Sequence, residues 1–307
     1  MNPRRRRALA VIMAGELYLG TGLAHAVEVA VLKSAAPASW RPALDALRRT
    51  ARAHHFTEYE LPADPAQAQQ AVTNMRGRAA VLVALGPQAA QAARAGLPDI
   101  PLVYCMVADP ARAGLLPAPA PHVSGVLFEV PVRNQLAAFR MVNPRAVRIG
   151  VLYSPEHTAL QVREAEKAAP VLRLVVTARA VGAGREVPAA LRALLTGPDA
   201  VDALWLPPDA LLLAADTRRF LFEEMSRAGK PVYAFSSALM ADGALASNGP
   251  DLVSVGQEAA GLVDRLAAGE RGLEARVPRA ELLVNVRLAA RLNVTVPEAA
   301  LKVARKY

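Results

Sequence analysis

AAVLVALGPQAAQAARAGLPDIPLVYCMVADPARAGL, residues 79–115, contains the clearest structural pattern in the chain. Its two apolar runs, Ala80–Leu85 and Leu102–Met106, are too short for helices and are typical of strands that are buried on both faces. The alanine-rich segment between them, Pro87–Ala95, has proline in its first turn and Gly96 directly after its end, as helices commonly do. The order strand, helix, strand predicts a parallel βαβ unit.

Both strands of this unit end in turn-forming residues. Gly86 joins the first strand to the helix, and Asp109-Pro110, followed by Gly114, ends the second strand. Open α/β sheets bind ligands at the carboxyl ends of their strands, beside helix N-termini, so these turns are candidate ligand contacts. A Rossmann-like domain needs glycine at such turns with or without a ligand, and the segment alone leaves both interpretations open.

The same alternation of short apolar runs and amphipathic segments extends in both directions along the chain. One βα series covers residues 27–143, the Asn143-Pro144 pair interrupts it, and a second series continues to residue 235. A chain of 307 residues is longer than one hydrophobic core usually supports, which favours two domains. Beyond residue 235 the pattern predicts strands at Ala244–Ser247 and Glu281–Asn285, with a long helix, Leu252–Ala268, between them.

These last elements are too few for a third domain, so we expect them to complete the two earlier sheets. The prediction is a first lobe of residues 27–143 plus 239–277 and a second lobe of residues 144–238 plus 278–307. A chain that crosses between two α/β lobes more than once forms a hinge with a ligand cleft beside it.

The N-terminus has the pattern of a secretory signal peptide over residues 1–26. Arg4–Arg7 form a charged start, Ala8–Leu23 a mostly apolar run, and Ala24-His25-Ala26 a small-x-small cleavage site. Glu16 interrupts the apolar run, which argues against a membrane-spanning helix because a carboxylate inside the bilayer is costly. The pattern favours export to the periplasm; the alternative is a basic tail on a cytosolic protein.

Composition and motifs exclude several classes of function. The net charge of +9 comes mostly from scattered arginines, without the recognition-helix or aromatic pattern of a nucleic-acid-binding protein. The single cysteine, Cys105, lies in an apolar run, where a free thiol behaves as a small buried hydrophobe. The sequence contains no phosphate-binding loop, nucleophile elbow or zinc-protease motif, and its histidines lack metal-ligand spacing. We therefore expect neither an enzyme nor a cofactor.

Several phrases, in order along nearly the whole chain, resemble one family, the ABC transporter substrate-binding proteins of the tryptophan/phenylalanine-binding type. The phrases are VALG, IPLVY, VADP, VSGV, RIGVLYSP, WLPPD, KPVYAF, GALAS and VNVRLAARLNVTVPEAAL. The resemblance implies a type I periplasmic-binding-protein fold: an α/β protein with two Rossmann-like lobes, parallel sheets and crossover strands. It also implies a ligand between the lobes and places its contacts, by motif position, at Gly86, Pro87, Gln88, Asp109, Leu127, Phe128, Tyr153, Ser154, Asp209 and Ser236.

Two alternatives remain for these positions. Tyr153 and Phe128 fit a hydrophobic core as well as a cleft, and Asp109 and Asp209 fit the caps of the helices that follow them. Where the family has GVSD, this chain has Gly125-Val126-Leu127-Phe128, so an aspartate is replaced by an aromatic residue. Strand alternation would point the next carboxylate, Glu129, away from Phe128.

These departures predict a small apolar or aromatic ligand, and weak binding of free α-amino acids. Pro87 has no N–H for a ligand carboxylate, and Phe128 stands where the family places a partner for an ammonium group. The function that this predicts is an exported, monomeric solute-binding protein that delivers its ligand to an ABC permease in the inner membrane. The alternative is an exported sensory or protein-interaction module on the same fold, which would act with a membrane sensor or receptor.

We expect export to remove residues 1–26, because the arginine run, the apolar run and the cleavage site occur in the required order. Mass spectrometry of the protein from its native host should find a chain that begins at Val27. An intact N-terminus in the cytosolic fraction would contradict this expectation.

Overall fold

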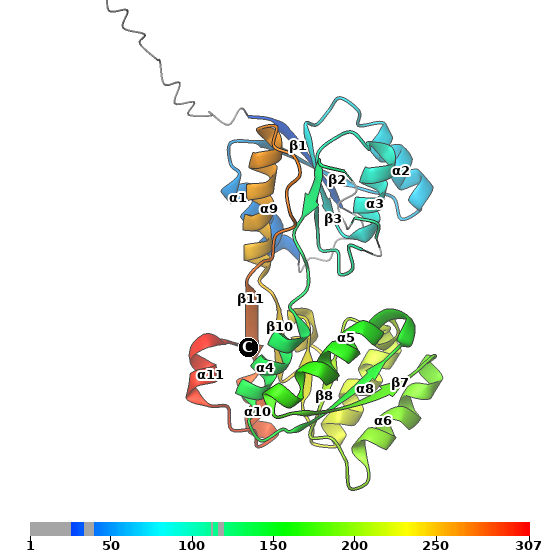
Figure 1. Ribbon diagram of the computed structural model, residues 1–307, viewed down its shortest axis with the longest axis vertical. Helices are drawn as coiled ribbons and strands as arrows, with labels where there is room; N and C mark the ends of the chain where they lie inside the picture. The colour runs from blue at the N-terminus through cyan, green and yellow to red at the C-terminus, as the bar shows by residue number, and fades with distance from the viewer. Residues whose placement is uncertain (1–25, 34–39, 112, 116–119) are drawn as a thin grey trace, which may run out of the picture.

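The computed structural model describes residues 26–33, 40–111, 113–115 and 120–307, and these residues form two α/β lobes (Figure 1). The first lobe is built on a five-stranded sheet with the order β2-β1-β3-β4-β5. The second is built on a seven-stranded sheet with the order β12-β11-β10-β9-β8-β6-β7. The expected α/β architecture with two Rossmann-like lobes is confirmed. The predicted signal peptide lies outside the described residues, apart from Ala26.

All strand pairs of the first sheet are parallel, and helices cover both of its faces. β3, α3 and β4 are the βαβ unit expected from residues 79–115, and every residue of β3 and β4 is buried. Gly86 begins α3 with a φ of 92°, a conformation that side chains other than glycine rarely adopt. The elements are β1 (Glu28–Lys33), α1 (Arg41–Thr50), β2 (His55–Glu60), α2 (Pro65–Thr73), β3 (Val81–Leu85), α3 (Pro87–Gly96), β4 (Leu102–Cys105) and β5 (Val123–Gly125).

The second sheet is parallel except for the antiparallel pair β10–β11, and apolar clusters lie on its two faces. Its strands are β6 (Arg148–Tyr153), β7 (Val175–Ala180), β8 (Ala203–Leu206), β9 (Val232–Ala234), β10 (Ala246–Pro250), β11 (Ala280–Val284) and β12 (Arg305–Lys306). Its helices are α4 (Val132–Val142), α5 (Pro155–Ala168), α6 (Val187–Leu195), α7 (Ala210–Leu213), α8 (Ala215–Arg227), α10 (Val286–Arg291) and α11 (Glu298–Val303), with a 3₁₀ turn, η4, at Ser237–Met240.

The described chain passes between the lobes three times. Residues 126–131 lead from β5 to α4, Asp251 joins β10 to α9 (Leu252–Ala267) in the first lobe, and residues 276–280 return the chain to β11. Backbone hydrogen bonds tie these passages together: Leu127 N–H donates to Arg276 O (2.9 Å), and Asp251 N–H donates to Arg279 O (2.8 Å). Figure 1 shows β11 leading into the second lobe, where β10 lies beside it and α4 lies against β10.

The predicted lobe boundaries were wrong in two places. Residues 132–142 were expected in the first lobe, but α4 packs into the second, where the Phe139 ring stacks on Tyr233 with centroids 4.8 Å apart. Residues 239–250 were also expected in the first lobe, but Leu239 and Met240 lie in the second core, and β10 pairs with β9. The Asn143-Pro144 pair ends a helix rather than a lobe, because the passage already occurs before α4 begins.

Helix α9 attaches the C-terminal part of the chain to the first lobe by packing closely against α1 (Figure 1). Gly256 permits this approach: a Cβ at this position would lie 2.1 Å from the backbone oxygen of Ala43 and 2.8 Å from the Cβ of Ala46. Backbone atoms cannot rotate away as a flexible side chain can, so the helices would have to separate.

We expect Gly256→Ala to destabilise the protein by about 1–3 kcal/mol, the usual cost of overpacking. Gly261→Ala is the matched control in the same helix, because a Cβ at Gly261 meets nothing within 4 Å. Alanine is the better helix former by about 1 kcal/mol, so this control should be neutral or stabilising. Chemical denaturation of both variants measures the difference; equal stability of the two would contradict the packing argument.

Candidate functional site

A small pocket lies between the lobes at the carboxyl ends of strands from both sheets. Phe128, Glu129 and Val130 come from the first passage, and Gln135 comes from α4. The remaining lining residues end or follow β4, β8, β9 and β10: Ala108, Pro208, Phe235 and Pro250. This is the position at which open α/β sheets bind ligands.

Of the ten residues predicted to contact a ligand, only Phe128 lines this pocket. Three others directly follow a lining residue: Asp109 follows Ala108, Asp209 follows Pro208, and Ser236 follows Phe235. At these strand ends the apolar residue therefore lines the pocket and the polar residue comes next. At these three turns the predicted residue and the lining residue are neighbours in the chain, and the predicted ligand contacts stay a prediction.

Asp209 is fully buried, and its carboxylate is occupied by the protein itself. Its Oδ2 accepts hydrogen bonds from Ser154 N–H (2.7 Å), Ser154 Oγ–H (2.9 Å) and Thr158 Oγ1–H (2.6 Å). Its Oδ1 accepts from Leu211 N–H (3.0 Å) and Leu212 N–H (3.3 Å), which caps α7. Asp209 thus joins the start of α5 to the turn after β8, and the cap interpretation of this residue is correct.

The pKa of the Asp209 carboxyl reflects two opposing effects. Burial raises it, whereas the hydrogen bonds from Thr158 and Ser154 lower it and together prevail, so the pKa lies below its ordinary value. The carboxylate is therefore charged and acts as an acceptor only. Its interactions stabilise the rim of the second lobe.

The other predicted residues also have local roles. Ser236 Oγ accepts a hydrogen bond from Ala238 N–H (3.3 Å) at the start of η4. Leu127 is half-buried beside Arg276 in the third passage, and Tyr153 packs against the core of the second lobe. Gly86 and Pro87 begin α3, and the Gln88 side-chain amide donates to the backbone oxygen of Ala63.

A hydrogen-bond chain extends from Asp209 to a histidine that the sequence analysis did not select. Ser154 has one hydroxyl proton and donates it to Asp209, so it can only accept from His157, whose Nδ1 lies 2.7 Å from Ser154 Oγ. This requires that Nδ1 carry a proton, which leaves Nε2 as an acceptor when the ring is neutral. His157 is exposed, in the first turn of α5. Only the fold reveals its position.

Glu129 is the second residue whose role the prediction missed. Residues 127–130 do not form a strand, so alternation does not apply, and Glu129 and Phe128 line the same pocket. Gln161 Nε2–H on α5 donates to Glu129 Oε1 (3.3 Å). Desolvation raises the pKa of the Glu129 carboxyl; the Gln161 hydrogen bond opposes this, and the charges of Asp109 and Glu164 raise the pKa further.

Gln135 holds the passage segment in place beside the pocket. Its Nε2–H donates to Val130 O (2.8 Å), and its Oε1 accepts from the buried Trp205 Nε1–H (3.2 Å). The amide thus connects the lining residue Val130 to a core residue of the second lobe. Both of its polar ends have partners, so we assign it a positioning role.

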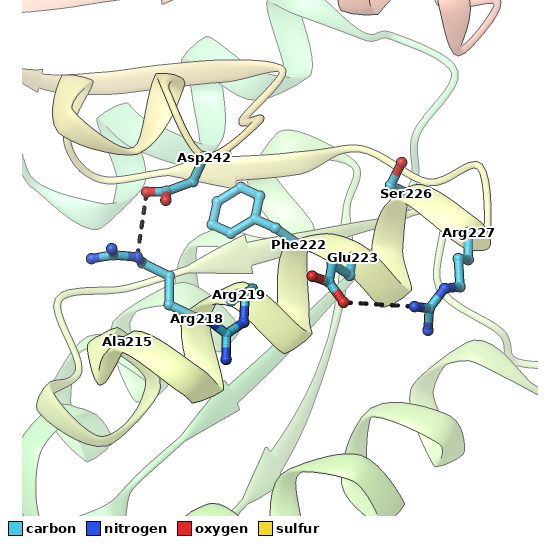
Figure 2. Close-up of a pocket in the computed structure, with 8 residues that line it drawn as sticks. All are labelled: Ala215, Arg218, Arg219, Phe222, Glu223, Ser226, Arg227 and Asp242. Carbon is cyan, nitrogen blue, oxygen red and sulfur yellow. Dashed lines mark ion pairs between the residues drawn. The ribbon is translucent and has the colours of Figure 1, made fainter.

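A larger concavity of about 610 Å³ lies along α8, away from all the predicted residues. Figure 2 shows its cations paired with acids: Arg218 with Asp242 (3.4 Å) and Arg227 with Glu223 (3.6 Å). Arg219 pairs with Asp216 (2.7 Å). Within each pair the two charges neutralise each other on an open surface, so we keep the pocket between the lobes as the candidate site.

Potential metal ligands and the cysteine can both be placed in the part of the chain that the structure describes. Within it, no group of three His, Cys, Asp or Glu side chains could hold a metal ion. Cys105 is buried, and burial raises the pKa of its thiol to about 12, so the reactive thiolate is not formed near neutral pH. None of the helices in the described ranges is long and apolar enough to cross a membrane.

Comparison with known proteins identifies a family and a shared fold. A family model described as ABC transporter substrate binding protein matches residues 53–307. A tyrosine-binding protein from Clostridioides difficile (strain R20291) is 27% identical over 196 residues, which are 62% of this chain and 55% of that protein. The chain therefore matches about half the length of this curated relative.

Two solved structures share the fold and cover 92% of this chain and 99% of their own. One is a ligand-free, open substrate binding protein with adhesive properties from Clostridium difficile (TM-score 0.78, 19% identity). The other, from Streptococcus pneumonia, is in complex with L-Trp (TM-score 0.70, 22% identity).

We expect Asp209→Asn to destabilise the protein by about 2–4 kcal/mol, because it replaces an acceptor of five hydrogen bonds by a group that also donates. Since the folded pKa of Asp209 is depressed, the carboxylate contributes stability above its unfolded pKa and loses it as pH falls through the folded one. Denaturation curves across the acid range should therefore show a weaker pH dependence for this variant. Asp216→Asn, at an exposed surface pair, is the control and should change little; a similar loss in both variants would contradict the network's role.

Proposed function

The chain belongs to the family of ABC transporter substrate-binding proteins, and from this premise we propose that it is the exported solute-binding protein of an ABC uptake system. In this proposal it binds a small aromatic ligand between its lobes and delivers it, as a periplasmic monomer, to a permease in the inner membrane. The observation that carries the proposal is the pocket between the lobes, at the carboxyl ends of both sheets and beside the three chain passages.

An aromatic ligand is supported by the residues that line this pocket. Phe128 from the first passage and Phe235 from the end of β9 supply two rings, and Ala108, Pro208 and Pro250 supply apolar surface. Rings pack favourably on rings in offset or edge-to-face arrangements. The printed names of two related proteins, one tyrosine-binding and one bound to L-Trp, agree with this ligand class.

Ligand capture would use the passages as a hinge. Two packed lobes joined by a few short segments can close on a ligand by small changes in the backbone of those segments. Phe128, Glu129 and Pro250 lie in or beside the passages, so closure would move them relative to the strand ends of both lobes. The ligand would then contact both lobes and favour the closed form.

A sensory or protein-interaction module is the second candidate function. The observation in its favour is that, among the described residues that line the pocket, only Glu129 and Gln135 have polar side chains, and Gln135 is bonded to the protein itself. A protein of this kind would retain the two lobes without tight ligand binding, and a sensor or receptor would replace the permease as its partner.

We expect aromatic ligands such as L-tryptophan and L-tyrosine to raise the melting temperature, and L-leucine and L-alanine to have little effect. A ligand at 100 times its Kd stabilises the folded protein by about 2.7 kcal/mol, which shifts the midpoint by several degrees. Thermal shift and calorimetry on the chain from Val27 measure this effect.

Phe128→Ala should weaken aromatic binding by about tenfold or more, because it removes about 1–3 kcal/mol of ring burial. Leu160→Ala is the control, since this α5 side chain is exposed to 71%. Failure of every aromatic compound to bind would overturn the proposal and favour the interaction module.

A further inference from the structure

Glu129 and His157 come from different parts of the chain, the first passage and α5, and these two segments are in contact beside the candidate site. Gln161, one helical turn after His157 on the same face of α5, donates to Glu129 Oε1 (3.3 Å). Glu164 lies on this face as well, and its charge acts on Glu129. The face of α5 that carries His157 therefore adjoins the first passage where Glu129 lines the pocket.

Both side chains offer acceptors rather than donors. The Glu129 carboxylate is acceptor-only when ionised, and its one hydrogen bond in the structure leaves further lone pairs. His157 Nδ1–H is committed to Ser154, whose own proton is committed to Asp209, so the neutral ring has its Nε2 lone pair left. Asp209 is buried and accepts hydrogen bonds on both oxygens, so each donor in this chain points toward it: His157 donates to Ser154, and Ser154 donates to Asp209.

The charges around the pocket favour a cation. Among the described residues that line it, Glu129 is the only ionisable one. Asp109 and Glu164 are close enough to repel its charge, which raises the pKa of the Glu129 carboxyl in the same direction as desolvation does. A positively charged ligand group would relieve this repulsion, whereas a ligand carboxylate would increase it.

We propose that Glu129 and His157 form an acceptor pair for an ammonium or other N–H-bearing cationic group, so that the site selects aromatic amines over aromatic acids. The inference rests on the proposed function, because it specifies the ligand class of the same pocket. It replaces the sequence-based view that the ammonium group lacks a partner, since that view depended on Glu129 pointing away.

Three indole compounds of the same side-chain length separate these chemistries: tryptamine carries the amine, indole-3-propionate the acid, and L-tryptophan both groups. Calorimetry on the chain from Val27 should find tryptamine bound at least about tenfold more tightly than indole-3-propionate, with L-tryptophan between them. Glu129→Gln should weaken tryptamine binding about tenfold and leave indole-3-propionate unchanged or tighter. Glu166→Gln, an exposed acid on another face of α5, should leave all three affinities unchanged.

Nuclear magnetic resonance of ¹⁵N-labelled histidine tests the imidazole independently of any ligand. At about pH 8, where ordinary imidazoles are neutral, His157 should have a protonated Nδ1 and an unprotonated Nε2. His157→Asn assigns the signal, and Ser154→Ala should release the ring from this tautomer. Addition of tryptamine to the wild-type protein should shift the Nε2 resonance of His157.

The outcomes distinguish failure of the acceptor pair from failure of the proposed solute-binding function. Equal binding of the amine and the acid, or unchanged tryptamine binding by Glu129→Gln, would overturn the acceptor pair while the solute-binding function stands. A protonated Nε2 at His157 would remove the imidazole from the pair. Failure of all three indoles and of the other aromatic compounds to bind would overturn the proposed function together with this inference.

Discussion

The threefold passage of the chain between the lobes is the constraint on which the structure depends. Residues 126–131, Asp251 and residues 276–280 are tied to one another by backbone hydrogen bonds, including those between Leu127 and Arg276 and between Asp251 and Arg279. The passages therefore hold the two lobes so that the carboxyl ends of strands from both sheets meet at the pocket. The pocket is a consequence of this connectivity. After β10 the chain leaves the second lobe to form α9 in the first, and it then returns to the second lobe to form β11.

At the strand ends, the side chains that cap the following turns and the side chains that line the pocket belong to different residues. Asp209 and Ser236 accept backbone hydrogen bonds from the turns that follow them, and the residues before them, Pro208 and Phe235, line the pocket. A helix N-terminus has unsatisfied N–H groups, so a short polar side chain is favoured at this position. The result is a pocket with apolar walls, in which one carboxylate, Glu129, dominates the electrostatics.

Hydrogen bonds that do not reach the pocket still set its chemistry. Asp209 orients Ser154, Ser154 orients the imidazole of His157, and Gln135 links Val130 to Trp205 in the core of the second lobe. Buried networks of this kind are rigid when every member is satisfied, and they fix which atoms remain available to a ligand. Preorganised acceptors of this kind lower the cost of ligand binding.

The sequence by itself determined the βαβ unit of residues 79–115, the two α/β series and the resemblance to a solute-binding family, because strand length, helix caps and turn residues are local properties. Only the tertiary structure decided to which lobe α4 and β10 belong, since an amphipathic helix does not encode the sheet that will cover its apolar face, nor a strand the neighbour with which it will pair. The site divides in the same way: the sequence predicts turns after the strands, but whether Pro208 or Asp209 lines the pocket depends on the backbone of the turn. Glu129 lies beside the helix that carries His157 because the first passage packs against α5, a contact between segments with no shared sequence pattern, and only the packed fold creates it.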